Sequence, residues 1–193
     1  ANDAAGIAAA VASCGAAGSP CFQCADACPV DDPGAFQYNG ACVVSVPCND
    51  CDDCNTTEHV LVTENDALFA HCPSVVTARV ATNVTSLRNY AFFQATNLAS
   101  VRLGNLSIGH SAFGKCSNLS SVDFGDVWRI GHGSFKYTSL TSVAIPETLS
   151  VIEAGTFLMC EDLTSVQLLD TVNEVQSLAF WGVPAEIQVP PNA

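Results

Sequence analysis

The amino-acid sequence predicts a mainly β repeat solenoid of about six turns of 21–23 residues, behind an amino-terminal disulfide-rich cap. Three observations predict this fold class. One phrase recurs between residues 67 and 189 and is marked by regularly spaced phenylalanines: Phe69, Phe92, Phe113, Phe135, Phe157 and Phe180. Eight cysteines crowd into residues 14–54, among Gly, Pro, Asp and Asn. Hydrophobic residues make up 49% of the chain and charged residues 13%, which is typical of a chain that folds.

The charge of the chain argues against two classes of partner. Its net charge is −13 at pH 7 with six lysines and arginines, whereas nucleic-acid binding and docking to anionic lipid need basic clusters. No apolar run reaches the roughly 18 to 20 residues that span a bilayer, so we expect no membrane insertion. All six bases lie between Arg79 and Lys136, and the acidic flanks are expected to be a solvated surface or, alternatively, to align subunits.

Residues 1–19 form an Ala-rich segment of low complexity. Short Ala-rich segments are marginal helices without tertiary support, so one interpretation is a disordered or weakly helical leader. The other is an arm that packs on a neighbouring subunit through Ile7 and Val11, because an exposed apolar tail otherwise invites non-specific association. The first residue is Ala rather than Met, which fits a cleaved secretory signal and an extracellular protein.

Residues 20–57 are predicted to form the cap. This segment has too few apolar residues to form a stable hydrophobic core and needs covalent cross-links. An even count predicts four disulfides among Cys14, Cys21, Cys24, Cys28, Cys42, Cys48, Cys51 and Cys54. Metal is the alternative, because two C-x-x-C pairs have the spacing of zinc ligands and the aspartates beside them could bind calcium. We favour disulfides and expect no metal or other cofactor.

Residues 58–193 are predicted to form the solenoid. It opens with Val60-Leu61-Val62, an apolar run typical of a first strand. After each phenylalanine, apolar residues follow with the spacing L-x-x-V-x-L, as in Leu119, Val122 and Phe124, which indicates a short half-buried strand. One turn cannot bury its apolar residues alone, so stacking of successive turns forms a continuous core.

The repeated phrase is clearest in Ile108-Gly109-His110-Ser111-Ala112-Phe113, which is followed by Cys116, Leu119 and Val122 and, in the next copy, by Ile145-Pro146. This pattern resembles the BspA-type (Treponema pallidum-type) leucine-rich repeats. The resemblance covers residues 67–189, although the last turn, from Phe180 to Ile187, lacks the Cys and the Leu. It implies a secreted or surface-exposed protein used for adhesion or recognition.

Three further cysteines, Cys72, Cys116 and Cys160, share one slot, three residues after the phenylalanine. They are two turns apart, which is about 9–10 Å at strand spacing and beyond the reach of a disulfide. We therefore expect three buried free thiols, and cap cysteines that pair among themselves.

The outward-facing strand position gives a row that begins with Arg79, Arg102 and Asp123 and then becomes small or polar. A recognition surface normally offers aromatic and arginine anchors, so these three residues form the one possible ligand corner of this face.

His110 and His132 should stack on adjacent turns, but their row lacks a third metal ligand and neither histidine has a nucleophile partner. We expect no catalytic residues and no enzyme.

Four N-x-S/T sequons predict N-linked glycans at Asn55, Asn83, Asn105 and Asn118. Glycans on the flanks of the solenoid would oppose lateral packing and leave its ends for contacts. A solenoid normally needs polar caps, yet the last turn carries Phe180, Trp181, Val183 and Ile187 with no comparable cap behind them. Prolines that blunt the edge are one explanation, and a second subunit that covers it is the other.

The function predicted from these features is a secreted, N-glycosylated, non-enzymatic structural protein whose partner is itself. Head-to-tail contacts do not close, so they would generate an extracellular filament or surface layer. The alternative is a cell-surface adhesion or ligand-recognition module that uses the corner of Arg79, Arg102 and Asp123.

Overall fold

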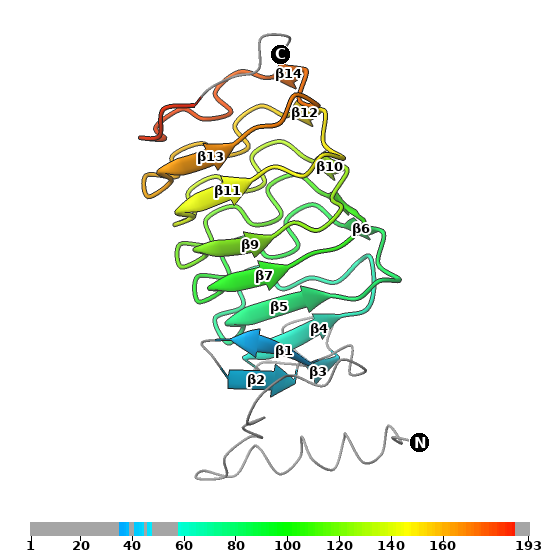
Figure 1. The fold of residues 1–193 in the computed structure, drawn as a ribbon. Helices are drawn as coiled ribbons and strands as arrows, with labels where there is room; N and C mark the ends of the chain where they lie inside the picture. Colours follow the sequence, from blue (N-terminus) through cyan, green and yellow to red (C-terminus); the bar gives the residue numbers. More distant parts are fainter. Residues whose placement is uncertain (1–34, 39–40, 45, 48–57, 188–193) are drawn as a thin grey trace. The chain divides into compact units, whose positions relative to one another are not determined.

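The structure is a computed structural model that describes residues 35–38, 41–44, 46–47 and 58–187. The chain divides into two compact units, Ala1–Val46 and Pro47–Ala193 (Figure 1). In the first unit, β1 (Ala35–Tyr38) pairs antiparallel with β2 (Ala41–Val44). The Ala-rich arm, with Ile7 and Val11, lies outside the described residues, as do all the cap cysteines except Cys42 in β2. Within the described residues, no helix is long and apolar enough to cross a membrane.

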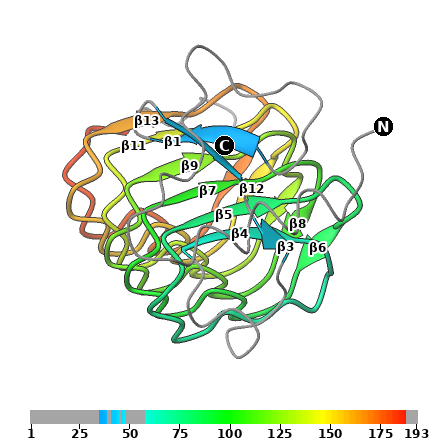
Figure 2. The ribbon, with the colours of Figure 1, turned by 90° about the horizontal axis from the view of Figure 1, so that it is seen from below.

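The second unit is a parallel β solenoid, as the repeats predict. Its first column of strands comprises β4 (His59–Val62), β5 (Thr77–Val80), β7 (Ser100–Arg102), β9 (Ser121–Asp123), β11 (Ser142–Ala144) and β13 (Ser165–Gln167). The short strand β3 (Val46–Pro47) lies at the sequence boundary between the two units. Its second column comprises β6 (Ser86–Leu87), β8 (Ser107–Ile108), β10 (Arg129–Ile130), β12 (Val151–Ile152) and β14 (Glu174–Val175). In the view of Figure 2 the successive turns overlie one another.

The third side of each turn is built around the repeat phenylalanine. The backbone N–H groups of the phenylalanine and of the residues two before and two after it donate to carbonyls of the next turn. In the central turn, Ser111 donates to His132 at 2.9 Å, and Phe113 donates to Ser134 at 2.8 Å. The intervening N–H groups donate within their own turn. From the second turn on, this alternation is accompanied by positive φ angles on both sides of the phenylalanine, as at Ser111 (φ 50°) and Lys115 (φ 61°).

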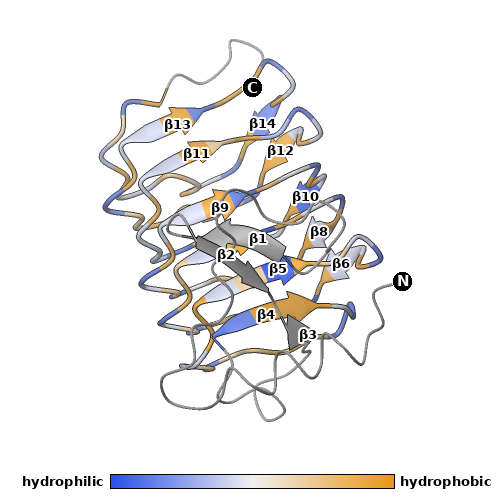
Figure 3. Ribbon diagram, turned by 60° about the horizontal axis from the view of Figure 1, so that its bottom comes forward, coloured by the Kyte–Doolittle hydropathy of each residue, from blue (hydrophilic) through white to orange (hydrophobic). Residues whose placement is uncertain are grey.

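The core is a continuous stack of apolar side chains inside the turns. The six repeat phenylalanines lie ring on ring, with neighbouring centroids 4.9 to 5.7 Å apart and ring planes within 13° of parallel. The first five are fully buried, whereas Phe180 is half-buried. Figure 3 shows the apolar residues returning at matching places from turn to turn, and hydrophilic residues at β10 and β14. Each turn therefore contributes the same layer to one shared core, as expected for a solenoid.

Both strand columns are interrupted at the same level. Within the described residues, no backbone hydrogen bond joins β9 to β11 or β10 to β12, so each column consists of two separate sheets. The third side is continuous there, because Phe135 donates to Thr156 at 2.9 Å. Beneath β9, Phe124 occupies a slot that is aliphatic in the other turns, and its ring lies edge-on to Phe135 at 5.4 Å. The bulkiest residue of this slot thus lies where the ladders stop.

The shared cysteine slot differs from the sequence prediction. Cys116 and Cys160 are free and buried, as expected, but Cys72 is disulfide-bonded. The expectation of a free thiol is therefore wrong for Cys72. The partner of Cys72 and the pairings predicted among the eight cysteines between residues 14 and 54 lie outside the side chains that the structure describes. The distance of two turns excluded disulfide bonds among Cys72, Cys116 and Cys160. It did not exclude a disulfide bond from one of them to a cysteine outside this row.

The two free thiols are expected to resist alkylation in the folded protein. Burial raises the pKa of Cys116 to about 12 and also raises the pKa of Cys160. Each thiol donates to a carbonyl of the preceding turn, Cys116 to Phe92 at 2.9 Å and Cys160 to Phe135 at 3.1 Å. At pH 8 both thiols therefore remain protonated and poorly nucleophilic. Mass spectrometry after brief iodoacetamide treatment should find them modified only in denaturant, and native modification at the rate of an exposed thiol would contradict this.

Candidate functional site

The three residues of the predicted ligand corner lie side by side, but two of their charges are paired with each other. Arg79, Arg102 and Asp123 are in register on β5, β7 and β9. The Arg102 guanidinium lies 3.2 Å from the Asp123 carboxylate, and both side chains are more than half exposed, so this ion pair contributes little to stability. Ala144 and Gln167 continue the row. The face is therefore small and polar beyond the corner.

The two histidines stack as the repeat alignment predicts. The rings of His110 and His132 are 5.1 Å apart and 3° from parallel, and the Tyr90 ring meets His110 edge-on at 5.2 Å. Burial is the main cause that lowers the pKa of His110, and the nearby His132 and Lys136 lower it further. Among the described residues, no group of three His, Cys, Asp or Glu side chains is placed to hold a metal ion.

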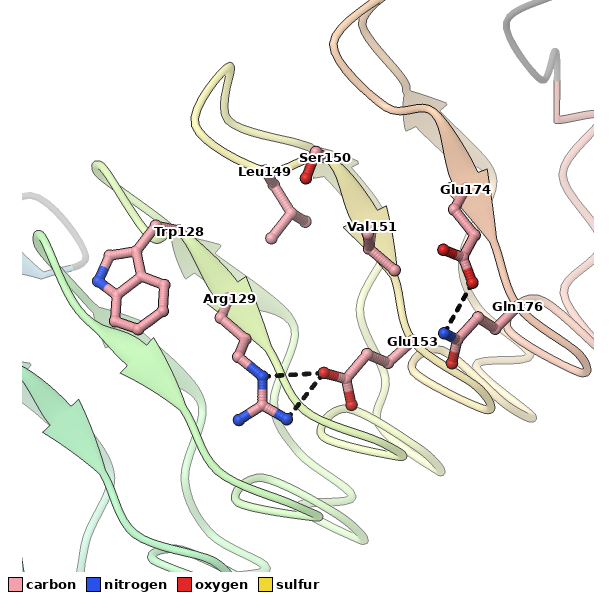
Figure 4. A pocket seen from close by; sticks show the side chains of 8 residues that line it. All are labelled: Trp128, Arg129, Leu149, Ser150, Val151, Glu153, Glu174 and Gln176. Carbon is pink, nitrogen blue, oxygen red and sulfur yellow. Dashed lines mark hydrogen bonds and ion pairs between the residues drawn. The ribbon is translucent and has the colours of Figure 1, made fainter. Parts of the chain in front are cut away.

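A groove lies on the flank where the second strand column is interrupted (Figure 4). Its volume is about 330 Å³, and it is lined by residues of three turns: Trp128, Arg129, Leu149, Ser150, Val151, Glu153, Glu174 and Gln176. The sequence prediction missed this site because no single repeat contains it. The signal available was Trp128, which follows a buried valine at a position where other turns carry Thr85, Ser150 and Asn173.

The last described turn is open on its outer side. Phe180 stacks on Phe157 at 5.3 Å, and its ring is half-buried rather than fully covered. Leu178 is 59% exposed and Trp181 is 58% exposed, whereas Val183 and Ile187 are half-buried. The N–H groups of Leu178, Phe180 and Gly182 have no backbone acceptor within the described residues, although the equivalent groups of the preceding turn all donate to this turn.

The described sequon asparagines are all at the surface. Asn83, Asn105 and Asn118 are exposed, and each is followed by a buried apolar residue. The Asn83 side-chain nitrogen donates to the carbonyl of Thr63 at 2.8 Å. Asn55 lies outside the described residues.

Parallel strands, one shared core and a period of 21 to 23 residues define a leucine-rich-repeat solenoid. Residues 62–187 match the BspA type leucine rich repeat region in six copies. The chain belongs to this family. No curated protein matches it.

Two solved structures are similar to this chain. A leucine rich cell surface protein from Faecalibacterium prausnitzii is 24% identical with a TM-score of 0.54, over 79% of this chain and 38% of that protein. The T. pallidum leucine rich repeat protein is 20% identical with a TM-score of 0.46, over 73% of this chain and 81% of that protein. The chain thus spans 38% of the length of the Faecalibacterium protein, and the likeness shows the fold alone.

Proposed function

We propose that the protein is a secreted, N-glycosylated, non-enzymatic structural protein that assembles head to tail into an extracellular filament or surface layer. The observation that supports this most is the open outer side of the last described turn. In each earlier turn, the equivalent N–H groups and phenylalanine ring contact the following turn. In the last described turn, the three N–H donors and the half-buried ring of Phe180 form the same kind of surface. A further turn, offered by another copy, would continue both the ladder and the stack.

The polarity of the ladder favours a head-to-tail arrangement over a symmetric pair. On the phenylalanine side, each turn offers N–H donors on its rear side, and the turn behind it offers carbonyls on its front side. Two rear sides placed face to face would set donors against donors along this side, whereas the front of a second copy presents acceptors there. A heterologous contact of this kind does not close upon itself and extends into a filament.

Apolar surface adds to the attraction at this end. Leu178 and Trp181 are exposed in the same turn as the half-buried ring of Phe180, and exposed apolar surface on a secreted protein favours association. In the proposal, Ile7 and Val11 of the Ala-rich arm cover this surface on the neighbouring copy. The arm (1–19), the disulfide cap (20–57) and the solenoid (58–193) then have separate roles in one assembly unit.

Glycans are compatible with this arrangement. Asn83, Asn105 and Asn118 lie on the sides of earlier turns and not on the last one, so glycans there would hinder lateral packing and leave the end free. An N-glycosylated amide keeps one hydrogen, so the bond from Asn83 to Thr63 can persist. The disulfide bond of Cys72 fits an oxidising, extracellular location, and so would the disulfides predicted in the cap.

The adhesion alternative has less support. Its corner is small, Arg102 already faces Asp123, and the remaining outward row lacks aromatic anchors.

Assembly is expected to depend on the open end. Sedimentation velocity and negative-stain electron microscopy of the full glycosylated chain should show concentration-dependent linear oligomers. Leu178→Glu and Trp181→Glu should each abolish them, because a carboxylate would have to be buried in the contact. Both side chains are more than half exposed, so neither change should unfold the protein.

Trp128→Glu serves as the matched control, because it places the same charge on an exposed indole two turns before the last turn. This variant should assemble normally. A wild-type protein that remains monomeric at high concentration, or oligomers unchanged in both end variants, would contradict the proposal.

A further inference from the structure

The groove at the interrupted flank has the features of a built site, independent of assembly. It lies between β10, β12 and β14, over two strand spacings, or about 10 Å. Leu149, fully buried, and Val151, half-buried, give it an apolar lining. In Figure 4, Trp128 lies at one end of the groove and the pair of Glu174 and Gln176 lies at the other. The volume of about 330 Å³ is at the lower end of the range of small-ligand sites.

Trp128 is the aromatic anchor of this groove. Its indole is 51% exposed, at a position that three other turns fill with the polar residues Thr85, Ser150 and Asn173. A half-exposed indole leaves a large apolar face in water and contributes little to the core. Exposed tryptophans beside a concave surface are typical contact residues for ligands, since the ring offers a flat, rigid face.

The polar side chains of the groove are held in place by one another. The guanidinium of Arg129 donates to one oxygen of Glu153 from both Nε, at 3.0 Å, and Nη2, at 2.9 Å. The Gln176 amide donates to Glu174 at 2.9 Å, and its oxygen accepts from the backbone N–H of Ala154 at 3.1 Å. These contacts fix the side chains before any ligand arrives, which reduces the ordering entropy that binding would cost.

The charges of Arg129, Glu153 and Glu174 determine which net charge a ligand of this groove can carry. A cation stacked on Trp128 would lie beside the guanidinium of Arg129, and an anion along the groove would meet the carboxylates of Glu153 and Glu174. A neutral ligand meets neither penalty. Donors and acceptors alternate from Arg129 through Glu153 and Gln176 to Glu174, which suits hydroxyl groups because each hydroxyl both donates and accepts.

We propose that this groove binds a neutral oligosaccharide. One sugar ring stacks its C–H face on the indole of Trp128. Hydroxyls of the following rings exchange hydrogen bonds with Glu153, Gln176 and Glu174, and the chain runs parallel to the solenoid axis. The span of about 10 Å selects an oligosaccharide over a single sugar.

The test uses the full chain after enzymatic removal of N-glycans, so that its own sugars do not compete. The chain has two tryptophans, so a Trp181→Phe background makes Trp128 the sole indole emitter. Maltotriose, cellotriose and N,N′,N″-triacetylchitotriose are the neutral probes, and tri-lysine and inorganic phosphate are the charged ones. At least one neutral probe should change the Trp128 emission, and its Kd should stay constant between low and high salt.

In the wild-type background, Trp128→Ala should raise the Kd of that sugar about tenfold or more, as read by saturation-transfer NMR. Glu174→Ala should also weaken binding. Tyr137→Ala removes an exposed aromatic side chain elsewhere on the solenoid and should leave the Kd unchanged. The proposal is overturned if no neutral probe binds, if only tri-lysine or phosphate binds, or if Trp128→Ala and Tyr137→Ala have equal effects.

Discussion

Replacing Phe113 with alanine is expected to lower the free energy of unfolding by about 3 to 5 kcal/mol. The Phe113 ring is fully buried between Phe92 and Phe135, with centroids 5.2 Å away on each side. Its removal takes one aromatic contact from both neighbours and leaves a cavity in the middle of the stack. The surrounding backbone cannot collapse easily, because hydrogen bonds to the next turn fix Phe113 and the residues around it.

Chemical denaturation of the variant with its disulfides intact measures this loss. Phe180→Ala is the matched control, because Phe180 is half-buried and stacks on one side only. It should cost less than half as much, since both the transfer term and the cavity are smaller. Equal losses for the two variants would mean that the ring stack is not the main source of stability.

Gly109→Ala is expected to destabilise the protein by about 3 kcal/mol, the upper part of the range for overpacked sites. An added Cβ would lie 2.5 Å from the carbonyl carbon of Arg88 and 2.6 Å from the nitrogen of Asn89. Both are backbone atoms of the preceding turn, so no side chain can rotate to make room. Relief requires the two turns to separate, which strains the bond from the Gly109 N–H to Leu87 at 2.9 Å.

Gly104→Ala is the control for the same chemical change. An added Cβ there meets nothing within 4 Å and the backbone has no positive φ, so stability should stay within about 0.5 kcal/mol of the wild type. Thermal and denaturant unfolding of both variants compare the two sites. A Gly109→Ala variant as stable as Gly104→Ala would show that the turns can separate locally without loss.

The slot of Gly109 also explains part of the sequence pattern. The two turns directly before the interruption carry glycine there, at Gly109 and Gly131, whereas the turn before them carries Arg88 and the two turns after it carry Glu153 and Gln176. Glu153 and Gln176 line the groove with side chains that glycine could not provide. The sequence shows this change of residue, but it does not show that the change coincides with the interruption of both strand columns.

Backbone conformation was predictable only in part. Gly133 and Gly155 suggest a left-handed position two residues before the phenylalanine, yet Tyr90, Ser111 and Leu178 adopt the same positive φ without a glycine. At Tyr90 and Ser111 this strain is offset by cross-turn hydrogen bonds from their own N–H groups to His110 and His132, which exist only once the turns are stacked. Residue type alone therefore does not identify these positions.

The sequence by itself determined the repeat, the strands, the buried phenylalanine row and the register that aligns Arg79 with Arg102 and Asp123, because these follow from a period that every turn shares. Only the tertiary structure decided what depends on differences between turns. The interruption, the groove beside Trp128, the disulfide bond of Cys72 and the open donors of the last turn belong to this class. A periodic pattern specifies how a turn meets an average neighbour, whereas these features arise from particular neighbours, which only packing brings together.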